Sequence, residues 1–202
     1  MILALDTSMG GYSLALLQDQ KCLVSQVEPT SRELSENLVP VLKDLMSQAN
    51  ASFGDLTHLV MATGPGTFTG IRVGYAMMKT LSIALDFPLY GVTTFDVCAG
   101  MVNADKPLLV VLDSKRAEPF VQSYYRSECP FQVPANVPLD VITGQMSNDA
   151  LVIGNALETF QNDFETHAIH TLDPLVMVEL ALEKNEIAVP FYVRPPDVTL
   201  KK

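Results

Sequence analysis

The chain has 202 residues, of which 48% are hydrophobic and 18% charged, and this is the composition of a globular protein with one domain or two. Its formal net charge of −10 argues against nucleic-acid binding by this chain alone, because such binding requires a basic surface. The sequence shows no basic leader segment and no apolar run of about 18 residues, so we expect a cytoplasmic protein that makes no contact with a membrane.

The three cysteines are odd in number and lie far apart, at Cys22, Cys98 and Cys129. This spacing is typical neither of a disulfide framework nor of a zinc site. We therefore expect small core residues in a reducing compartment.

The first half of the chain alternates strand and helix patterns. Strands are predicted at 2–5, 12–17, 22–27, 58–61 and 88–92. Helices are predicted at 31–49, capped by Thr30 or Ser31, at 70–85, capped by Thr67 or Thr69, and at 94–101. This order is typical of an α/β unit.

The pattern restarts in the second half. The apolar run 108–112 ends in Asp113 and Ser114, just as the run 2–5 ends in Asp6 and a hydroxyl residue. A return strand at 120–125, a strand at 151–153, a helix at 174–183 and a short strand at 191–193 follow. The repetition indicates a duplicated α/β unit with subdomains at 1–104 and 105–202, the second one reduced.

A glycine-rich turn separates the strand 58–61 from the helix 70–85. Gly64-Pro65-Gly66 suits a sharp strand-to-helix turn. The turn matches neither the P-loop nor the GxGxxG pattern, so packing is favoured over a nucleotide cradle. Gly66, Gly70 and Gly74 recur every fourth residue and share one helix face, so they predict that another backbone approaches closely there.

Both long helices carry apolar surface that needs a cover. The helix 31–49 has an apolar stripe, and the helix 70–85 is apolar almost all round, with Arg72 and Lys79 as its charged residues. The cover can be the protein's own domain or a partner. The Arg72 side chain can likewise form an internal ion pair, or reach a carboxylate or phosphate of a partner.

Several segments along the whole chain resemble one family. They are Ile2–Ser8, Ser31–Pro40, Ala62–Gly74, Leu112–Glu118 and Tyr192–Pro195. Together they resemble the bacterial TsaB (YeaZ) family, which takes part in making threonylcarbamoyladenosine beside the anticodon of tRNA. The resemblance implies an α/β actin-like, Hsp70-like ATPase (ASKHA) fold. Two departures from the family are Leu34, where a histidine is usual, and Ala117-Glu118-Pro119-Phe120, where Gly-Glu-Val-Tyr is more frequent.

The resemblance also implies partners. This chain would be a noncatalytic scaffold that forms a heterodimer with catalytic TsaD. The ATPase TsaE would join them, and a TsaC-type synthase would supply threonylcarbamoyl-AMP. The chain would form a homodimer when alone and would meet tRNA only through the complex. The expected interface residues are Leu34, Leu38, Leu42, Gly66, Phe68, Gly70, Arg72, Val73, Gly74 and Met77.

Nucleotide chemistry is a second hypothesis. In the actin-like fold, Asp6 and Asp113 would face each other across a cleft and hold Mg²⁺ through water, with Thr7 and Ser8 beside them. Alternatively, each aspartate caps its own turn. The resemblance implies no required cofactor, or weak ATP and Mg²⁺ binding shared at the complex interface. A phosphotransferase or ATPase of this superfamily is therefore the alternative function.

A glycoprotease activity is the least favoured reading. His58, His167 and His170 do not form the paired metal-binding motif of a metalloprotease, and no serine or cysteine nucleophile motif is present. We therefore expect neither a metal site nor catalytic residues in this chain.

Overall fold

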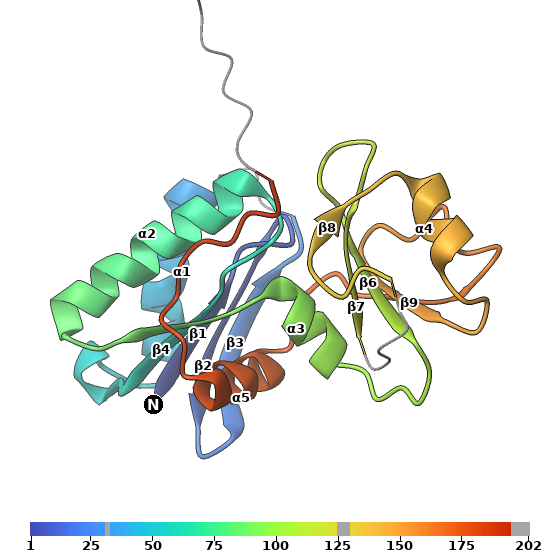
Figure 1. Ribbon diagram of the computed structural model, residues 1–202. Helices are drawn as coiled ribbons and strands as arrows, with labels where there is room; N and C mark the ends of the chain where they lie inside the picture. Colours follow the sequence, from blue (N-terminus) through green and yellow to red (C-terminus); the bar gives the residue numbers. More distant parts are fainter. Residues whose placement is uncertain (31–32, 125–129, 195–202) are drawn as a thin grey trace, which may run out of the picture.

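The computed structural model describes residues 1–30, 33–124 and 130–194. These residues form two lobes, each built on a five-stranded mixed sheet (Figure 1). Among the described residues, no helix is both long enough and apolar enough to cross a lipid bilayer.

The first lobe contains the larger set of helices. Its strands are β1 (Ile2–Asp6), β2 (Tyr12–Gln18), β3 (Lys21–Glu28), β4 (His58–Ala62) and β5 (Leu89–Val92). They lie in the order β3-β2-β1-β4-β5, with β1, β4 and β5 parallel and the other neighbours antiparallel. Its helices are α1 (Leu34–Gln48), the single 3₁₀ turn η1 (Phe53–Asp55), α2 (Phe68–Leu85) and α3 (Thr94–Gly100).

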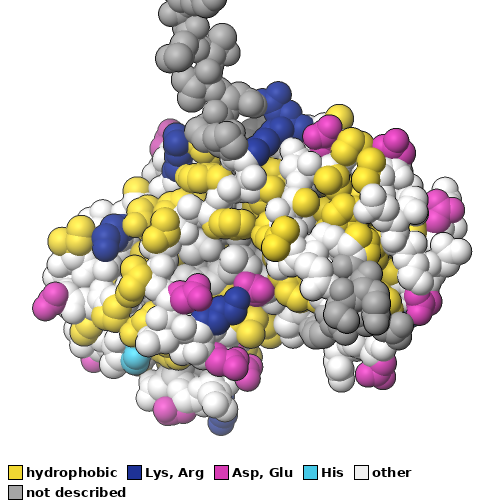
Figure 2. All heavy atoms as spheres, viewed as in Figure 1, with side chains coloured by type: hydrophobic (Ala, Val, Ile, Leu, Met, Phe, Trp, Pro, Cys, Tyr) yellow, Lys and Arg dark blue, Asp and Glu magenta, His cyan; other side chains and the backbone are white. Residues whose placement is uncertain are grey.

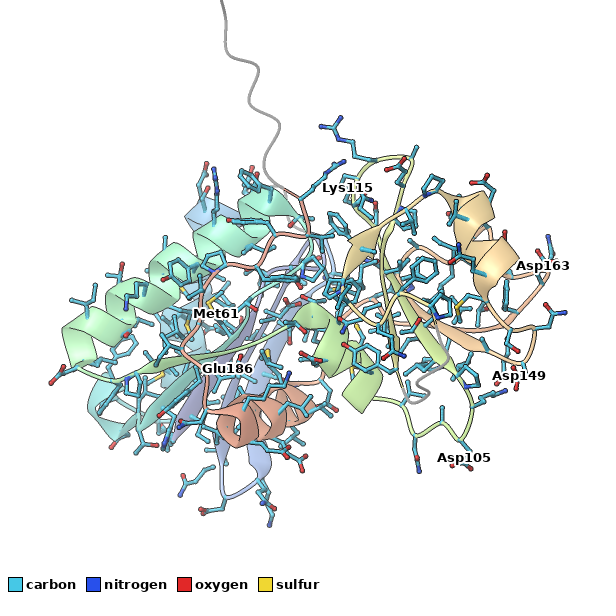
Figure 3. All side chains as sticks on the ribbon, in the orientation of Figure 1. Met61, Asp105, Lys115, Asp149, Asp163 and Glu186 are labelled. Atoms are coloured by element: carbon cyan, nitrogen blue, oxygen red, sulfur yellow. The ribbon has the colours of Figure 1, made fainter. Side chains whose placement is uncertain are left out.

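Helices cover both faces of the first sheet. On β1, Leu3 and Leu5 belong to the core beneath α1 and α2, whereas Ala4 points to the opposite core with α3 and α5 (Pro174–Lys184). Because β1, β2 and β4 are covered on both faces, these strands read as nearly continuous apolar runs and not as alternating ones, whereas the edge strand β3 is largely exposed. Side chains fill both layers, with Met61 in the one under α1 and α2 (Figure 3).

The second lobe repeats the topology of the first. Its strands are β6 (Leu108–Leu112), β7 (Phe120–Tyr124), β8 (Ala135–Asn136), β9 (Leu151–Gly154) and β10 (Glu165–Ala168). Their spatial order is β10-β9-β6-β7-β8, with β6, β9 and β10 parallel. Taken in chain order, the two sheets have the same strand arrangement and directions, which confirms the predicted duplication.

The second copy is shorter at several corresponding places. Strand β8 has two residues, and α4 (Leu139–Gln145) has seven where α1 has fifteen. The described residues 155–164, between β9 and β10, fold into turns, where the first lobe has the 18-residue α2. The predicted reduction of the second unit is therefore correct.

The last part of the chain returns to the first lobe. The predicted subdomain boundary, between residues 104 and 105, falls between α3 and β6. Helix α5 comes after this boundary in the chain, but it packs against β4, β5 and α3 of the first lobe. The following segment crosses the same lobe, where the Ala188 N–H donates to Leu89 O at 2.8 Å and the Phe191 N–H to Thr63 O at 2.8 Å. The strand predicted at 191–193 is not formed, because this segment joins the sheet by single bonds and not by a ladder.

Other predicted boundaries also need correction. Helix α1 begins at Leu34 with Glu33 at the N-cap, later than the predicted start; Ser31 lies outside the described residues. Strand β10 was not predicted, because its sequence Glu-Thr-His-Ala is mostly exposed and has no apolar alternation. Cys98 is buried as expected, but Cys22 is exposed on the edge strand β3, and Cys129 lies outside the described residues.

Candidate functional site

The glycine face of α2 is covered by the chain's own loop after β1. A Cβ on Gly66 would lie 2.1 Å from the carbonyl oxygen of Ser8, and one on Gly70 would lie 2.1 Å from that of Thr7. A Cβ on Gly74 would lie 2.2 Å from Thr7 Oγ1. The close backbone approach that the spacing predicted is present, but it occurs within one chain. This corrects the expectation that a partner's backbone lies against these glycines.

The loop after β1 also forms hydrogen bonds with Thr67, the N-cap residue of α2. The Thr67 N–H donates to Ser8 O at 2.8 Å, and the Thr67 hydroxyl donates to Thr7 O at 3.4 Å. Thr67 therefore occupies the N-cap position, but its side chain does not cap the first turn of α2. The N–H groups of that turn are left without the acceptor that a threonine N-cap usually gives.

Asp6 is sealed inside the first lobe. Its Oδ1 accepts hydrogen bonds from the Ser8 N–H at 2.7 Å and from the Ser8 hydroxyl at 2.6 Å, and Thr94 donates to that same hydroxyl at 2.9 Å. Burial raises the pKa of Asp6, and the bonds from Ser8 only partly oppose this shift. The carboxyl group thus holds the turn after β1 together.

Asp113 plays the corresponding part in the second lobe. It accepts hydrogen bonds from the Lys115 N–H at 2.6 Å and from Lys115 Nζ at 2.7 Å. Its own N–H donates to the side-chain oxygen of Asn155 at 2.8 Å, which ties the turn to the end of β9. Both aspartates therefore cap their own turns, as the alternative interpretation of the sequence proposed.

The two aspartates do not fit a shared Mg²⁺ site. Asp6 is 2% exposed and the neighbouring Thr7 and Ser8 are equally buried, whereas Asp113 lines a separate cavity with Asn155. A buried carboxyl group with a raised pKa is a poor ligand for a hydrated cation. Among the described residues, no group of three or more His, Cys, Asp or Glu side chains is placed to hold a metal.

The raised pKa of Asp6 predicts a pH effect on stability. Because the folded state holds this proton more tightly than the unfolded state does, Asp6 lowers the unfolding free energy as pH rises from 3.8 towards the raised pKa. The slope from this group approaches about 1.4 kcal/mol per pH unit. The variant Asp6→Asn keeps the Oδ1 acceptor but cannot titrate. We therefore expect its unfolding free energy, measured by urea unfolding between pH 4 and 7, to lack the decrease with pH that Asp6 causes in the wild type.

Asp55 offers a comparison of opposite sign. Hydrogen bonds from Ser52 lower the pKa of Asp55, so its contribution is present above 3.8 and is lost as pH falls through the lowered pKa. The unfolding free energy of Asp55→Asn should therefore approach that of the wild type as pH falls.

The result for Asp6 can also contradict the prediction. If the unfolding free energies of Asp6→Asn and the wild type change with pH in parallel, the buried carboxyl group does not control the pH dependence of stability.

The interior faces of α1 and α2 are closed as well. Leu34, Leu38 and Leu42 are at most 8% exposed and pack in the core between α1 and the first sheet. This corrects their assignment to a partner interface, because the apolar stripe of α1 is covered by its own domain.

The outward side of the same two helices exposes apolar groups. Ile83 on α2 is 72% exposed and Val39 on α1 is 47% exposed. We call this surface, which also includes the exposed Pro40 and Ala76, the α1–α2 face. The predicted interface residues Val73 and Met77 are half-buried against the core under these helices. Yellow side chains are visible along α2 (Figure 2).

Arg72 extends this surface towards the C-terminal segment. Its guanidinium carbon lies 3.6 Å from the ring centroid of Phe68, and the Phe68 ring lies 5.1 Å from that of Tyr192. This stacking positions an exposed cation near the N-terminal end of α2. Neither of the two roles predicted for Arg72 included this aromatic contact.

The topology and the comparisons define a duplicated α/β protein, in which two lobes of the same strand order each carry a five-stranded mixed sheet. The structure of YeaZ from Pseudomonas aeruginosa superimposes with a TM-score of 0.77 over 95% of this chain and 98% of that one, at 21% identity. The sequence model of a family described as "TsaD: tRNA N6-adenosine threonylcarbamoyltransferase" matches residues 25–128, just over half of the chain.

Curated relatives are similar over a shorter range. The chain is 29% identical over 130 residues to the tRNA threonylcarbamoyladenosine biosynthesis protein TsaB of Escherichia coli (strain K12), which covers 63% of this chain and 56% of that protein. It is 28% identical over 124 residues to TsaB of Bacillus subtilis (strain 168), which covers 61% and 54%. The chain thus spans little more than half the length of these relatives. It belongs to the family that the TsaD sequence model describes, and within it the chain is similar to the TsaB and YeaZ proteins.

Proposed function

We propose that the chain takes part in forming threonylcarbamoyladenosine in tRNA, as a noncatalytic subunit that pairs with a TsaD-type catalytic protein. Its relatives TsaB of E. coli and B. subtilis are named for this biosynthesis. In this proposal, a TsaE-type ATPase joins the pair, and a TsaC-type synthase supplies the threonylcarbamoyl group. The tRNA is bound by the complex as a whole.

The observation that carries the pairing is the α1–α2 face. Two neighbouring helices expose Ile83 and Val39, while their inner faces and the glycine face are closed. The family model that matches this chain is itself described by TsaD. Two proteins of related fold can join through equivalent surfaces, and a symmetric dimer of one of them can use the same surface. The face therefore suits both the heterodimer and a homodimer of the free chain.

The arrangement of the two aspartates supports the noncatalytic assignment. Asp6 and Asp113 each hold their own turn, and they do not line a common cavity. An independent ATPase or phosphotransferase of this fold would need them to face one bound nucleotide. Mg-ATP turnover by the isolated chain would therefore contradict the proposal.

The direct test is reconstitution. The chain is mixed with a TsaD-type protein from the same source, and the complex is analysed by co-purification and light scattering. Modification of tRNA is then followed with all pathway proteins present and with this chain alone left out. We expect a stable heterodimer and loss of modification on omission. Full modification without this chain would refute the proposal.

A further inference from the structure

The two sheets of the molecule end in four edge strands, β3, β5, β8 and β10. An edge strand has unpaired N–H and C=O groups that can pair with another chain, and proteins usually protect it with a bulge, lysine, proline or a covering segment. Strand β3 has Lys21 and an irregular register opposite Leu16 and Leu17, and β8 has only two residues after Pro134. Strand β10 contains neither lysine nor proline, and its register with β9 is regular.

Strands β5 and β10 hold equivalent positions in the two lobes, at the end of the row of parallel strands. The edge of β5 is covered by the chain itself. Residues 186–188 run antiparallel to it, with Ile187 opposite Tyr90, and the Gly91 N–H donates to Glu186 O at 2.9 Å. Within the part of the chain that the structure describes, no segment pairs with β10 in this way. The duplication therefore shows which kind of chain fits the free position, namely an extended antiparallel segment.

The register determines which backbone groups of β10 are free. The Ile169 N–H donates to Gly154 O at 2.8 Å, and successive residues of a strand direct their backbone groups to opposite edges. The N–H and C=O groups of Thr166 and Ala168 therefore point away from β9. No backbone hydrogen bond reaches these groups from another described residue. Because Thr166 is half-buried and Ala168 is exposed, this edge is open to another chain.

The surface around this edge is acidic. Strands β6, β9 and β10 are parallel neighbours, so their N-terminal ends lie together at one end of the second sheet. Four exposed carboxylates lie at these ends: Asp105, Asp149, Asp163 and Glu165. The neighbouring cation Lys106 is already paired with Glu165. The three aspartates lie along the outer margin of the second lobe (Figure 3). A second copy of this chain, with its net charge of −10, would be repelled there, whereas a basic segment would be attracted.

We propose that the free edge of β10 binds an extended segment of another protein that is rich in lysine and arginine. The segment adds a strand antiparallel to β10, as residues 186–188 do on β5. Main-chain hydrogen bonds with Thr166 and Ala168 provide affinity, and the surrounding carboxylates provide selectivity for a basic sequence. This edge lies in the second lobe and the α1–α2 face in the first, so the basic segment binds independently of a TsaD-type protein.

Titration calorimetry of the full chain at low salt tests the edge, with a short capped peptide of alternating lysine and valine as the probe. We expect saturable binding, accompanied by shifts of the amide resonances of Thr166 and Ala168 in nuclear magnetic resonance spectra. A peptide with glutamate in place of lysine should not bind. A peptide that keeps the lysines but has methyl groups on its backbone nitrogens lacks hydrogen-bond donors, and it should bind about tenfold more weakly.

Two variants test the edge from the protein's side. Thr166→Pro removes the outward N–H and leaves the ladder to β9, because proline is tolerated where the N–H of an edge strand faces solvent; it should weaken binding about tenfold. Asp163→Lys reverses a charge beside the edge and should also weaken binding. Glu179→Lys makes the same charge change at an exposed position of α5 in the first lobe, and it should bind like wild type. Urea unfolding checks each variant, and Asp163→Lys keeps the test decisive if Thr166→Pro does not fold.

The proposal is overturned if the glutamate peptide or the methylated peptide binds as tightly as the lysine peptide, or if the lysine peptide does not saturate at millimolar concentration. It is also overturned if Ile83→Lys, on the α1–α2 face, abolishes binding while Thr166→Pro and Asp163→Lys do not. Sedimentation of Ile83→Lys tests self-association through β10. A dimer that Thr166→Pro removes would assign the edge to a second copy of this chain and not to a basic partner.

Discussion

Gly70→Ala is expected to lower the unfolding free energy by about 3 kcal/mol or more. The new methyl carbon would lie 2.1 Å from the backbone oxygen of Thr7 and 2.4 Å from Thr67 Oγ1. A backbone oxygen at the end of β1 cannot move without shifting the turn that Asp6 holds. Urea unfolding of the isolated chain measures the effect, and no partner is required.

A graded series separates crowding from general effects of adding a methyl group. At Gly74 the nearest atom is a side-chain oxygen, Thr7 Oγ1 at 2.2 Å, which can rotate away, so Gly74→Ala should cost less than Gly70→Ala. Gly144 in α4 has no atom within 4 Å of the added carbon, and Gly144→Ala should stabilise by up to about 1 kcal/mol. If Gly70→Ala leaves stability unchanged and weakens only partner binding, the glycine face is an interface after all.

The sequence was informative wherever local chemistry and overall topology agree. The two apolar runs that end in Asp6 and Asp113 identified the duplication, because each begins a β-meander whose first strand is buried on both sides. The spacing of Gly66, Gly70 and Gly74 correctly indicated a close backbone approach. Such sequence patterns predict the structure correctly because they reflect steric requirements of the backbone itself.

The same patterns could not predict which segment packs against a given surface, the chain's own or a partner's. The glycine spacing does not distinguish the chain's own Thr7 and Ser8 from a partner's backbone, since both present peptide oxygens. The stripe of α1 likewise predicted burial, but its residues Leu38 and Leu42 meet the first sheet and not a second subunit. Assigning the cover needs the tertiary fold.

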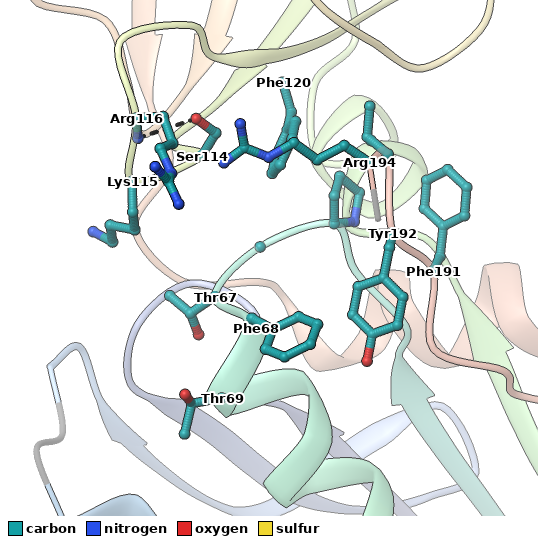
Figure 4. A pocket seen from close by; sticks show the side chains of 13 residues that line it. Thr67, Phe68, Thr69, Ser114, Lys115, Arg116, Phe120, Phe191, Tyr192 and Arg194 are labelled. Carbon is teal, nitrogen blue, oxygen red and sulfur yellow. Dashed lines mark hydrogen bonds between the residues drawn. The ribbon is translucent and has the colours of Figure 1, made fainter. Parts of the chain in front are cut away.

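A cavity between the two lobes, lined among others by Lys115, Arg116 and Arg194, was missed for a related reason (Figure 4). Lys115 and Arg116 stand next to each other in an acidic chain, which was an available signal. Arg194, however, lies far along the chain and reaches them only because α5 and the segment after it return to the first lobe. That return follows from tertiary packing and from no periodicity in the sequence.

Ile83→Lys is expected to weaken the heterodimer with a TsaD-type protein by about 100-fold, with little change in stability. Ile83 is 72% exposed on the α1–α2 face, so an interface there would bury it, and a buried lysine charge without a partner is costly. In the free chain, an exposed substitution changes the unfolding free energy by only about 0.5 kcal/mol. A cation near the C-terminal end of α2 also suits the helix dipole.

Val133 provides the matched control because it is equally exposed, at 72%, but lies in the second lobe. Val133→Lys adds the same charge, so general repulsion would affect both variants alike, whereas loss of a specific contact affects only Ile83→Lys. Calorimetry gives the heterodimer affinity, and sedimentation gives the homodimer affinity of the free chain. Because one surface is proposed for both assemblies, Ile83→Lys should weaken the two together. A heterodimer that tolerates Ile83→Lys but fails with Val133→Lys would move the interface to the second lobe.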